Sequence, residues 1–232
     1  MYVPKAFAIE DTPAIHNAMD AVGLALLVTA TAAGPVATHL PLLLVREEGE
    51  FGTLYGHVAR ANRHWQAEGI GEALAVFQGA DGYVTPSWYP TKAETGRVVP
   101  TWNYLAVHAG GPVTFVEDRD RLLDVVTRLT ERQEAPRARP WSVEDAPADH
   151  IATLLRAIVG LRLPIRTLQA SFKMNQTKQD RDRRGALDCQ TRRRAAAPAL
   201  KPQRLSEPSQ PRRLNHTIRP PAAIAMKSST AG

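Results

Sequence analysis

The pattern of apolar and polar residues predicts many short strands and few helices. Apolar runs rich in β-branched residues cover 24–30, 36–45 and 51–58, and turn-forming residues separate them at Gly34-Pro35 and Gly49. Runs of this kind, bounded by Gly and Pro, indicate a meander of antiparallel strands. Further strands are expected at 73–78, 83–88, 98–108 and 113–116, with a last one across 160–172.

Three helices interrupt these strands. Asp11 is a capping residue ahead of Pro13, and Ile15, Met19 and Val22 continue this first helix at helical spacing. Two later segments begin at Asp118 and Asp149, and each carries an apolar stripe: Leu122, Val125, Val126 and Leu129 in the first, and Ile151, Leu154, Leu155 and Ile158 in the second.

The order of these elements predicts a mainly β fold. Strands do not alternate with helices, which argues for a closed barrel with peripheral helices and against a doubly wound parallel sheet. Neither GxGxxG nor GxxxxGK[ST] occurs in the sequence. A Rossmann or P-loop nucleotide site would require one of these glycine-rich loops.

Charge is distributed unevenly along the chain. The sequence of 232 residues has a net charge of +6. Residues 177–232 contain 13 Lys and Arg against four Asp and Glu, so residues 1–176 carry a net charge of −3. The positive charge is therefore a property of the C-terminal segment, and it does not mark residues 1–176 as a nucleic-acid binder.

The C-terminal segment is expected to be disordered over 186–232. Residues 177–232 contain no Phe, Trp or Tyr, and six prolines lie between Pro198 and Pro221. Such a segment buries too little apolar surface to offset its ordering entropy. We therefore expect one folded domain over 1–185, followed by a basic tail that is either a solvated appendage or an arm that contacts nucleic acid or another anionic surface.

Composition excludes several protein classes. Cys189 is the single cysteine, so no internal disulfide can form, which favours a reducing compartment. The N-terminal sequence lacks a basic segment followed by an apolar one, and the apolar runs are far shorter than the roughly 20 residues of a membrane-spanning helix. We expect a cytoplasmic protein with no membrane partner.

Two polar stretches on predicted strands are candidates for ligand binding. His39 lies within an apolar strand, where it is either a hydrogen-bonded core residue or a donor to a ligand. His57, Arg60 and Asn62 follow one another at a strand end. Cationic and amide donors at one rim suit a phosphate or a carboxylate, and the alternative is a solvated strand end.

Two further stretches combine tryptophan with polar residues. They lie at 85–92 and 99–104 and contain Ser87, Trp88, Tyr89, Lys92, Thr101, Trp102 and Asn103. Flat side chains beside hydroxyl, amide and amine groups would cover a planar heteroaromatic ring and bind its edge and a phosphate tail. Packing inside the barrel or at an interface explains the same residues equally well.

The sequence predicts neither a catalytic nucleophile nor a metal site. Ser87 does not belong to a GxSxG elbow, and Cys189 falls in the basic tail. His57 and His64 are seven residues apart, without the helix and carboxylate that would complete a metal site.

Residues 1–185 also contain a series of longer motifs in a fixed order: MYVPKAF, THLPLLL, GHVARAN, VFQGADGYVTPSWYPTK, VVPTWNYLAVHA, WSVEDAPADHI, AIVGLRLPI and FKMNQ. Together they resemble the PaiB family of FMN-binding negative transcriptional regulators. The resemblance implies a split β-barrel of the flavin-reductase and pyridoxamine-oxidase type. It also implies a homodimer with FMN in the cleft between subunits and a role in repressing bacterial genes.

The same resemblance implies roles for residues in the matching motifs. Arg60 and Lys92 would neutralise the FMN phosphate, with His57 and Asn62 beside Arg60. The residues that would line the ring are Trp88, Tyr89, Thr101, Trp102 and Asn103. Further candidates for cofactor contact are His39, Ser87 and Lys173, followed by Asn175 and Gln176.

The chain departs from the family at two places, and three functions stay open. The family commonly reads Lys-Leu/Met-Ser-Gln-Asn where this chain has KMNQT from Lys173, and the resemblance ends after Gly185. The chain is a PaiB-like repressor, an FMN-dependent oxidoreductase of the split-barrel type, or a protein for another planar cofactor such as haem or a deazaflavin. Without a visible helix-turn-helix pattern, DNA contact would come from a local patch, the basic tail or a partner.

Overall fold

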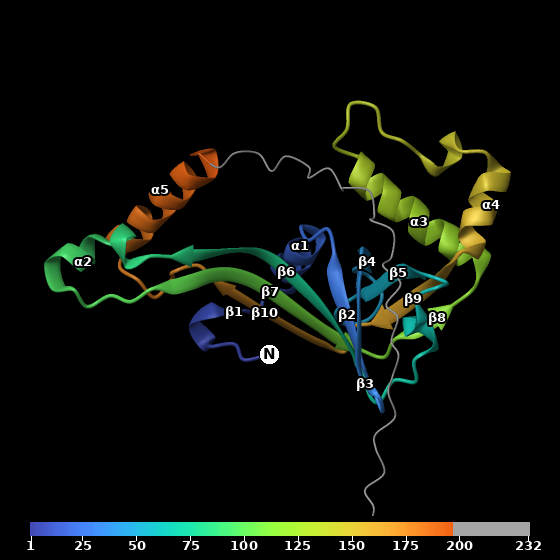
Figure 1. Cartoon of the computed structure of the whole chain (residues 1–232), viewed down its shortest axis with the longest axis horizontal. Coiled ribbons are helices and arrows are strands. Elements are labelled where there is room, and N and C mark those ends of the chain that lie inside the picture. The colour runs from blue at the N-terminus through green and yellow to red at the C-terminus, as the bar shows by residue number, and fades with distance from the viewer. Residues whose placement is uncertain (197–232) are drawn as a thin grey trace, which may run out of the picture.

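The computed structural model describes residues 1–196, and in that range the strands form two antiparallel sheets (Figure 1). The six-stranded sheet has the order β1 (Ala8–Ile9), β10 (Thr167–Lys173), β7 (Thr101–Gly111), β6 (Ala73–Val84), β2 (Ala25–Thr31) and β3 (Gly34–Leu40). The four-stranded sheet has the order β4 (Leu42–Val45), β5 (Thr53–Ala59), β9 (Ile158–Pro164) and β8 (Thr114–Val116).

Helices lie at both ends of the molecule and between them. They are α1 (Thr12–Asp20), α2 (Pro90–Thr95), α3 (Arg119–Glu134), α4 (Ala148–Arg156) and α5 (Asp180–Ala196), with short 3-10 turns η1 (Lys5–Phe7), η2 (Arg63–Gln66), η3 (Pro86–Trp88) and η4 (Val143–Asp145). The long strands β6, β7 and β10 extend away from α3 and α4 toward a lobe that contains α2 and α5 (Figure 1). We call η3, α2 and α5 with their connecting residues the distal lobe.

Most of the predicted strand segments form, but several of their boundaries are wrong. The run 36–45 divides at Pro41, which has no backbone N–H for a ladder, and the chain passes there from the six-stranded to the four-stranded sheet. The run 160–172 divides at Ile165, whose N–H bonds to Gly52 O at 3.0 Å. The run 73–78 continues to Val84 as β6 across an irregularity between Gln78 and Asp81, whereas the rest of the predicted strand 83–88 is wrong, because Pro86–Trp88 form the 3-10 turn η3.

One core fills the space between the two sheets. Side chains that face it alternate along each strand, and those with almost no exposure are Leu27, Leu54, Phe77, Val107, Val159, Leu161 and Leu163. Helix α1 adds Ile15 and Met19 to the same cluster, as its predicted apolar stripe requires. The helix begins where the sequence predicts, because Asp11 Oδ2 accepts from Ala14 N at 2.9 Å.

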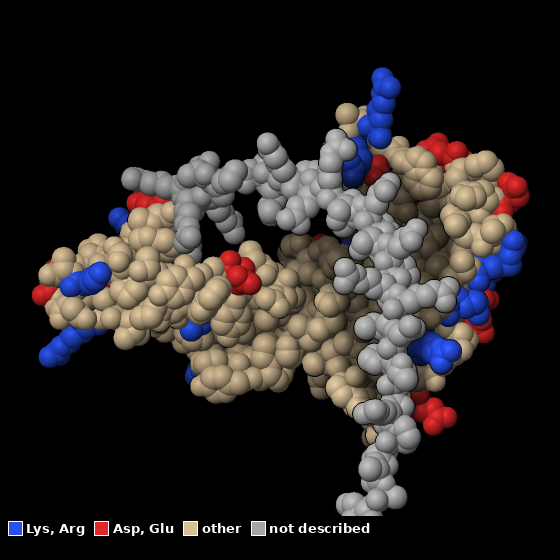
Figure 2. Space-filling model, viewed as in Figure 1, with Lys and Arg blue, Asp and Glu red and all other residues tan. Residues whose placement is uncertain are grey.

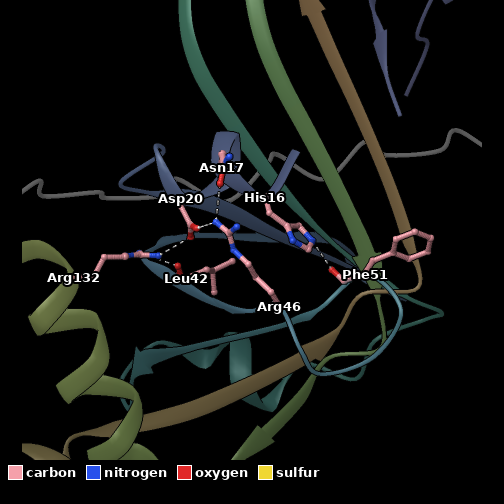
Figure 3. A network of polar contacts seen from close by, with 7 residues as sticks. All are labelled: His16, Asn17, Asp20, Leu42, Arg46, Phe51 and Arg132. Carbon is pink, nitrogen blue, oxygen red and sulfur yellow. Dashed lines mark hydrogen bonds and ion pairs between the residues drawn. The ribbon is translucent and has the colours of Figure 1, made fainter. Parts of the chain in front are cut away.

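A polar network fixes α1 to β4 and α3 (Figure 3). Arg46 Nη2 donates to Asp20 Oδ2 at 2.6 Å and to Asn17 Oδ1 at 3.0 Å. Arg132 on α3 lies 3.4 Å from Asp20 Oδ1 and donates to Leu42 O at 2.9 Å. The Asp20 carboxylate therefore balances two guanidinium groups that come from different elements.

Helix α5 crosses the boundary that was expected between the folded domain and the tail. Ala186 is 1% exposed and packs against Val84 and Tyr89. The expected end of the folded part at residue 185 is therefore too early, since the helix continues to Ala196. Composition missed this helix because its arginine content suggested a solvated tail, whereas residues 180–196 contain no proline and its apolar contact is made by the small side chain of Ala186. The remainder of the expected tail, 197–232, lies outside the described residues.

Two further contacts hold α5 against α2. Asp182 is 3% exposed, and its Oδ1 accepts from Thr91 N at 3.1 Å, which caps the first turn of α2 from another helix. Arg181 Nη1 pairs with Glu94 Oε1 at 2.6 Å. Within residues 1–196, no helix is both long and apolar enough to cross a membrane.

Candidate functional site

The structure places the candidate residues in two groups far apart in one chain. The barrel group lies on β3, on β5 and in the turn before η2: His39, His57, Arg60 and Asn62. The lobe group lies in the distal lobe and on the adjoining ends of β7 and β10: Ser87, Trp88, Tyr89, Lys92, Thr101, Trp102, Asn103 and Lys173. These elements are at opposite ends of the molecule (Figure 1), so Arg60 and Lys92 do not meet around one phosphate within a single chain.

Arg60 holds the C-terminal end of α4. Its Nε donates to Arg156 O at 2.8 Å, and its Nη2 lies 3.3 Å from Ile158 O. Its Nη1 forms an ion pair with Glu117. The guanidinium thus satisfies carbonyls at a helix end and carries a counter-charge of its own.

Asn62 belongs to a buried hydrogen-bond network around His64. Its Oδ1 accepts from His64 N at 3.0 Å, and its Nδ2 donates to Thr38 Oγ1 at 3.1 Å. His64 Nδ1 lies 2.8 Å from Thr38 Oγ1 and Nε2 lies 2.9 Å from Thr29 Oγ1. Burial lowers the pKa of His64, which fits a neutral ring bonded to two hydroxyls. Asn62 therefore acts within the core, and sequence reasoning missed His64 as its partner.

Histidine protonation should weaken the fold at low pH. Burial lowers the pKa values of His57, His64 and His108 below the ordinary 6.5. The unfolded chain then binds protons at higher pH than the folded chain, so stability is lost as pH falls below about 6.5. Urea unfolding at about pH 7.5 and pH 5.5 should show this loss, and it should be smaller in His64→Gln. Equal unfolding free energies at both pH values would contradict lowered histidine pKa values in the folded chain.

His57 faces α3 from the outer side of the four-stranded sheet. With Pro41, Leu129 and Trp141 it lines a cavity of about 330 Å³. Its Nδ1 is buried and has no hydrogen-bond partner among the described residues. His57 and Arg60 are three positions apart in the sequence, but His57 faces α3 and Arg60 contacts the end of α4.

In the distal lobe, Tyr89 is a core residue. It is 2% exposed, and its hydroxyl donates to Asn175 Oδ1 at 3.2 Å. Burial and the nearby Asp182 raise its pKa. Trp88 is half-buried against the same cluster. These contacts explain why the two aromatic residues are adjacent in the sequence, and they leave the Tyr89 ring without exposed surface.

The other members of the lobe group are more accessible. Lys92 Nζ donates to Ser87 Oγ at 3.3 Å, and both side chains are exposed. Thr101 and Asn103 alternate with Trp102 along β7, so they face the opposite side of the sheet. Asn103 is buried, and its Oδ1 has no hydrogen-bond partner among the described residues.

One side of the six-stranded sheet faces away from the core. The register places Leu26 beside Val76 and Val76 beside His108 on this side, while Phe77 and Val107 face the core. We call it the outer face. It includes Leu26, Val28, Ala37, His39, Leu74, Val76, Gln78, Asp81, Tyr83, Trp102, Tyr104, Ala106, His108, Gln169 and Lys173. Its aliphatic side chains on β2 and β6 are only half-buried.

Aromatic and cationic groups gather at the lobe end of the outer face. Trp102 is 54% exposed, and its ring meets Tyr83 edge-on with centroids 5.8 Å apart. Lys173 pairs in register with Tyr104, and its Nζ lies 5.6 Å from the Phe7 ring centroid. The outer face therefore carries three candidates: Trp102 and Lys173 lie at its lobe end, and His39 lies far from them on the edge strand β3. Sequence reasoning missed Tyr83 and Tyr104, which strand alternation around Trp102 could have identified.

A cavity of about 830 Å³ lies elsewhere, between α3 and the outer side of the four-stranded sheet. Tyr55 at its floor donates to Glu48 Oε2 at 2.6 Å and accepts from Arg162 Nε at 3.1 Å. Burial, together with the hydrogen bond to Glu48, raises the pKa of Tyr55. None of these three residues was a candidate in the sequence.

Comparison with known proteins assigns the family. Residues 1–167 match the family model described as "Putative FMN-binding domain". The chain belongs to this FMN-binding family. It is also 31% identical over 183 residues to Protease synthase and sporulation protein PAI 2 of Bacillus subtilis, a match that covers 78% of this chain and 85% of that protein. The resemblance to the PaiB family is confirmed, and FMN is confirmed as the family's cofactor.

Solved structures confirm the fold of this FMN-binding family member. The flavocytochrome Anf3 from Azotobacter vinelandii superposes with a TM-score of 0.53 at 16% identity, over 94% of this chain and 92% of that one. The FAD and heme binding protein from Mycobacterium smegmatis superposes with a TM-score of 0.50 at 16% identity, over 88% and 93%. The split-barrel expectation is therefore correct. Uncharacterized fungal proteins match as well, so the relatives are not confined to bacteria.

The groups on the outer face fit the chemistry of the family's cofactor. An exposed tryptophan with a neighbouring tyrosine offers aromatic surface to a planar ring, and Lys173 offers a cation to a phosphate. Half-buried aliphatic residues on β2 and β6 continue this surface toward His39. The outer face is therefore our candidate surface for FMN.

Proposed function

We propose that this protein is a PaiB-type transcriptional regulator that binds FMN between two copies of its chain in the cytoplasm. The observation that carries the proposal is the outer face, which exposes aliphatic and aromatic side chains over several strands in a member of an FMN-binding family. Apolar surface of this extent marks an interface or a ligand site.

The separation of the candidate residues supports a second copy in the site. His39 lies on the edge strand β3, and Trp102 and Lys173 lie where β7 and β10 adjoin the distal lobe. A two-fold dimer that pairs the outer faces would cover the exposed aliphatic residues of both copies. It would also enclose a flat ring better than one open sheet can.

The chain's own groups would then have distinct tasks. Trp102 and Tyr83 would cover the ring, Lys173 would pair with the phosphate, and His39 would donate a hydrogen bond. Bound FMN supplies a redox-active ring that accepts one or two electrons. The aliphatic residues of the outer face would exclude water from that ring.

The visible absorption spectrum of the purified protein tests the proposal. We expect a flavin band that is released on denaturation, and turnover of NADH or NADPH that does not exceed that of free FMN. A colourless protein that also rejects added FMN would contradict flavin binding. Sustained turnover would instead identify an FMN-dependent oxidoreductase.

Truncation tests how the regulator would contact DNA. Residues 197–232 contain six Lys and Arg against one Glu, so a chain that ends at Ala196 should lose salt-sensitive, sequence-independent DNA association. Because α5 stays intact, its melting temperature and FMN affinity should match the full chain. Binding to a DNA duplex at two salt concentrations measures the first effect. Unchanged association would place the DNA contact within residues 1–196.

A further inference from the structure

The cavity of about 830 Å³ between α3 and the outer side of the four-stranded sheet has a charged lining of its own. Residues of β5, β8 and β9 form its sheet side, and one flank of α3 forms the other side. Val116 and Val125 give it apolar surface. Its charged side chains are three acidic and three basic ones: Glu48, Asp120, Asp124, Arg121, Arg128 and Arg162. The lining is therefore neutral as a whole, although it carries charges of both signs.

Helix α3 separates this cavity from the residues with an implied role in FMN binding. The cavity that contains His57 is lined by Val126 and Thr130 of α3, whereas this cavity is lined by Asp124 and Arg128. Because an α-helix turns once in about 3.6 residues, the two pairs lie on opposite flanks of α3. The lining contains none of the candidates for FMN contact, and the outer face belongs to the other sheet.

Two guanidinium groups converge on the cavity without a matching carboxylate. Arg162 Nε donates to the Tyr55 hydroxyl at 3.1 Å, and Arg162 Nη2 lies 3.9 Å from Glu48 Oε2, beyond hydrogen-bond distance. Within residues 1–196, the Arg121 side chain makes no hydrogen bond or ion pair. Arg121 comes from α3 and Arg162 from β9, yet both also line an adjoining cavity of about 10 Å³. A carboxylate between them would pair with both groups.

Two carboxylates stand on α3 beside these arginines. Asp120 and Asp124 are four positions apart, so they lie on the same side of the helix, and both are exposed. Asp124 Oδ2 lies 3.6 Å from Arg128 Nη1. The Asp120 side chain makes no hydrogen bond or ion pair with another described residue. Each carboxylate can therefore accept hydrogen bonds from an ammonium group.

The mixture of charges favours a small ligand that carries both signs. Acidic and basic groups in equal number would repel a polyanion and a polycation alike. On the face shown in Figure 2, basic and acidic side chains also lie interspersed at the end of the molecule that carries α3 and α4. A nucleic acid or an anionic membrane on this face would meet acidic side chains as well as basic ones.

From these contacts we propose that this cavity binds a small zwitterion, an α-amino acid with an aliphatic side chain. Its carboxylate pairs with Arg121 and Arg162, and its ammonium group pairs with Asp124. Its aliphatic side chain lies against Val116 and Val125. This inference does not depend on FMN binding, because its residues and its ligand are different.

L-Leucine is the probe for this site, together with two analogues that each lack one charge. Isocaproate has the same aliphatic chain without the ammonium group, and isoamylamine has it without the carboxylate. L-Leucine should raise the melting temperature of the full chain, because a ligand that binds the folded state stabilises it. At equal concentration each analogue should have a much smaller effect. Equal effects of the three compounds, or no effect of L-leucine, would overturn the proposal.

Substitutions test the two charged contacts. Arg121→Gln and Asp124→Asn should each weaken L-leucine binding roughly tenfold in titration calorimetry, the scale of one charge-assisted hydrogen bond. Both side chains are exposed, so neither change opens the core. The matched control is Arg166→Gln, which removes an exposed arginine paired with Glu72 at 3.0 Å and should leave L-leucine binding unchanged. Equal weakening in all three variants would contradict the proposed contacts.

Selectivity between the analogues provides a second arm, which a misfolded variant cannot reproduce. Asp124→Asn removes a carboxylate that repels an anion, so this variant should bind isocaproate more tightly than the parent chain does. Arg121→Gln should bind isoamylamine more tightly for the corresponding reason. Weaker binding of both analogues in both variants would overturn the proposal. FMN that competes with L-leucine would also overturn it, because the cavity would then belong to the FMN site.

Discussion

Gly111→Ala should prevent the chain from folding, or should lower its unfolding free energy by at least about 3 kcal/mol. A Cβ atom at Gly111 would lie 2.0 Å from Pro164 O and 3.2 Å from Leu163 Cδ2. The first neighbour is backbone, so a change of rotamer cannot relieve the overlap. This close approach is where β7 passes the end of β9, and it joins the two sheets.

Gly23→Ala is the matched control for this prediction. A Cβ atom there meets nothing within 4 Å, and the residue has no positive φ. Its unfolding free energy in urea should stay within about 0.5 kcal/mol of the parent chain. If both variants unfolded at the same urea concentration as the parent, the described crossing of the two sheets would be wrong.

Trp102→Ala should weaken FMN binding by about 2 kcal/mol, roughly thirtyfold, while it leaves the melting temperature of the cofactor-free protein nearly unchanged. Trp102 is 54% exposed and meets only the edge of Tyr83, so its removal opens no cavity in the core. The lost energy is that of a large aromatic surface against a planar ring. Fluorescence titration with FMN measures the affinity.

Trp141→Ala is the control for this second prediction. Trp141 is 45% exposed, but it lines the cavity beneath α3 with His57 and not the outer face. Its loss should leave FMN affinity unchanged. Equal losses of FMN affinity in Trp102→Ala and Trp141→Ala would show that FMN does not bind on the outer face.

Local signals in the sequence predicted most of the elements. Asp11 and Asp118 cap helices as expected, since each side chain accepts from the backbone N–H three residues later. The boundaries failed where the deciding contact is distant in sequence. Ile165 leaves β9 because its N–H bonds to Gly52 O. A window of neighbouring residues contains no trace of that contact.

The candidate site was harder to predict than the fold, because the identity of a residue does not determine which way its side chain faces. Tyr89 and Trp102 both lie in Trp-rich polar stretches, yet one is buried under α5 and the other is exposed on the outer face. Arg60 stands in a motif with donors for an anion, but it is held by Glu117 and by carbonyls at the end of α4. Strand register and helix docking decide these outcomes.

Sedimentation velocity followed at a flavin absorption wavelength tests whether FMN binds at a site formed by two copies of the chain. Flavin absorbance should sediment with a species of two chains, and dilution below the dimer dissociation constant should release FMN. In Trp102→Ala, dimer formation and FMN binding should both require a higher protein concentration. Flavin that stays bound to a single chain at every concentration would contradict a site formed between two copies.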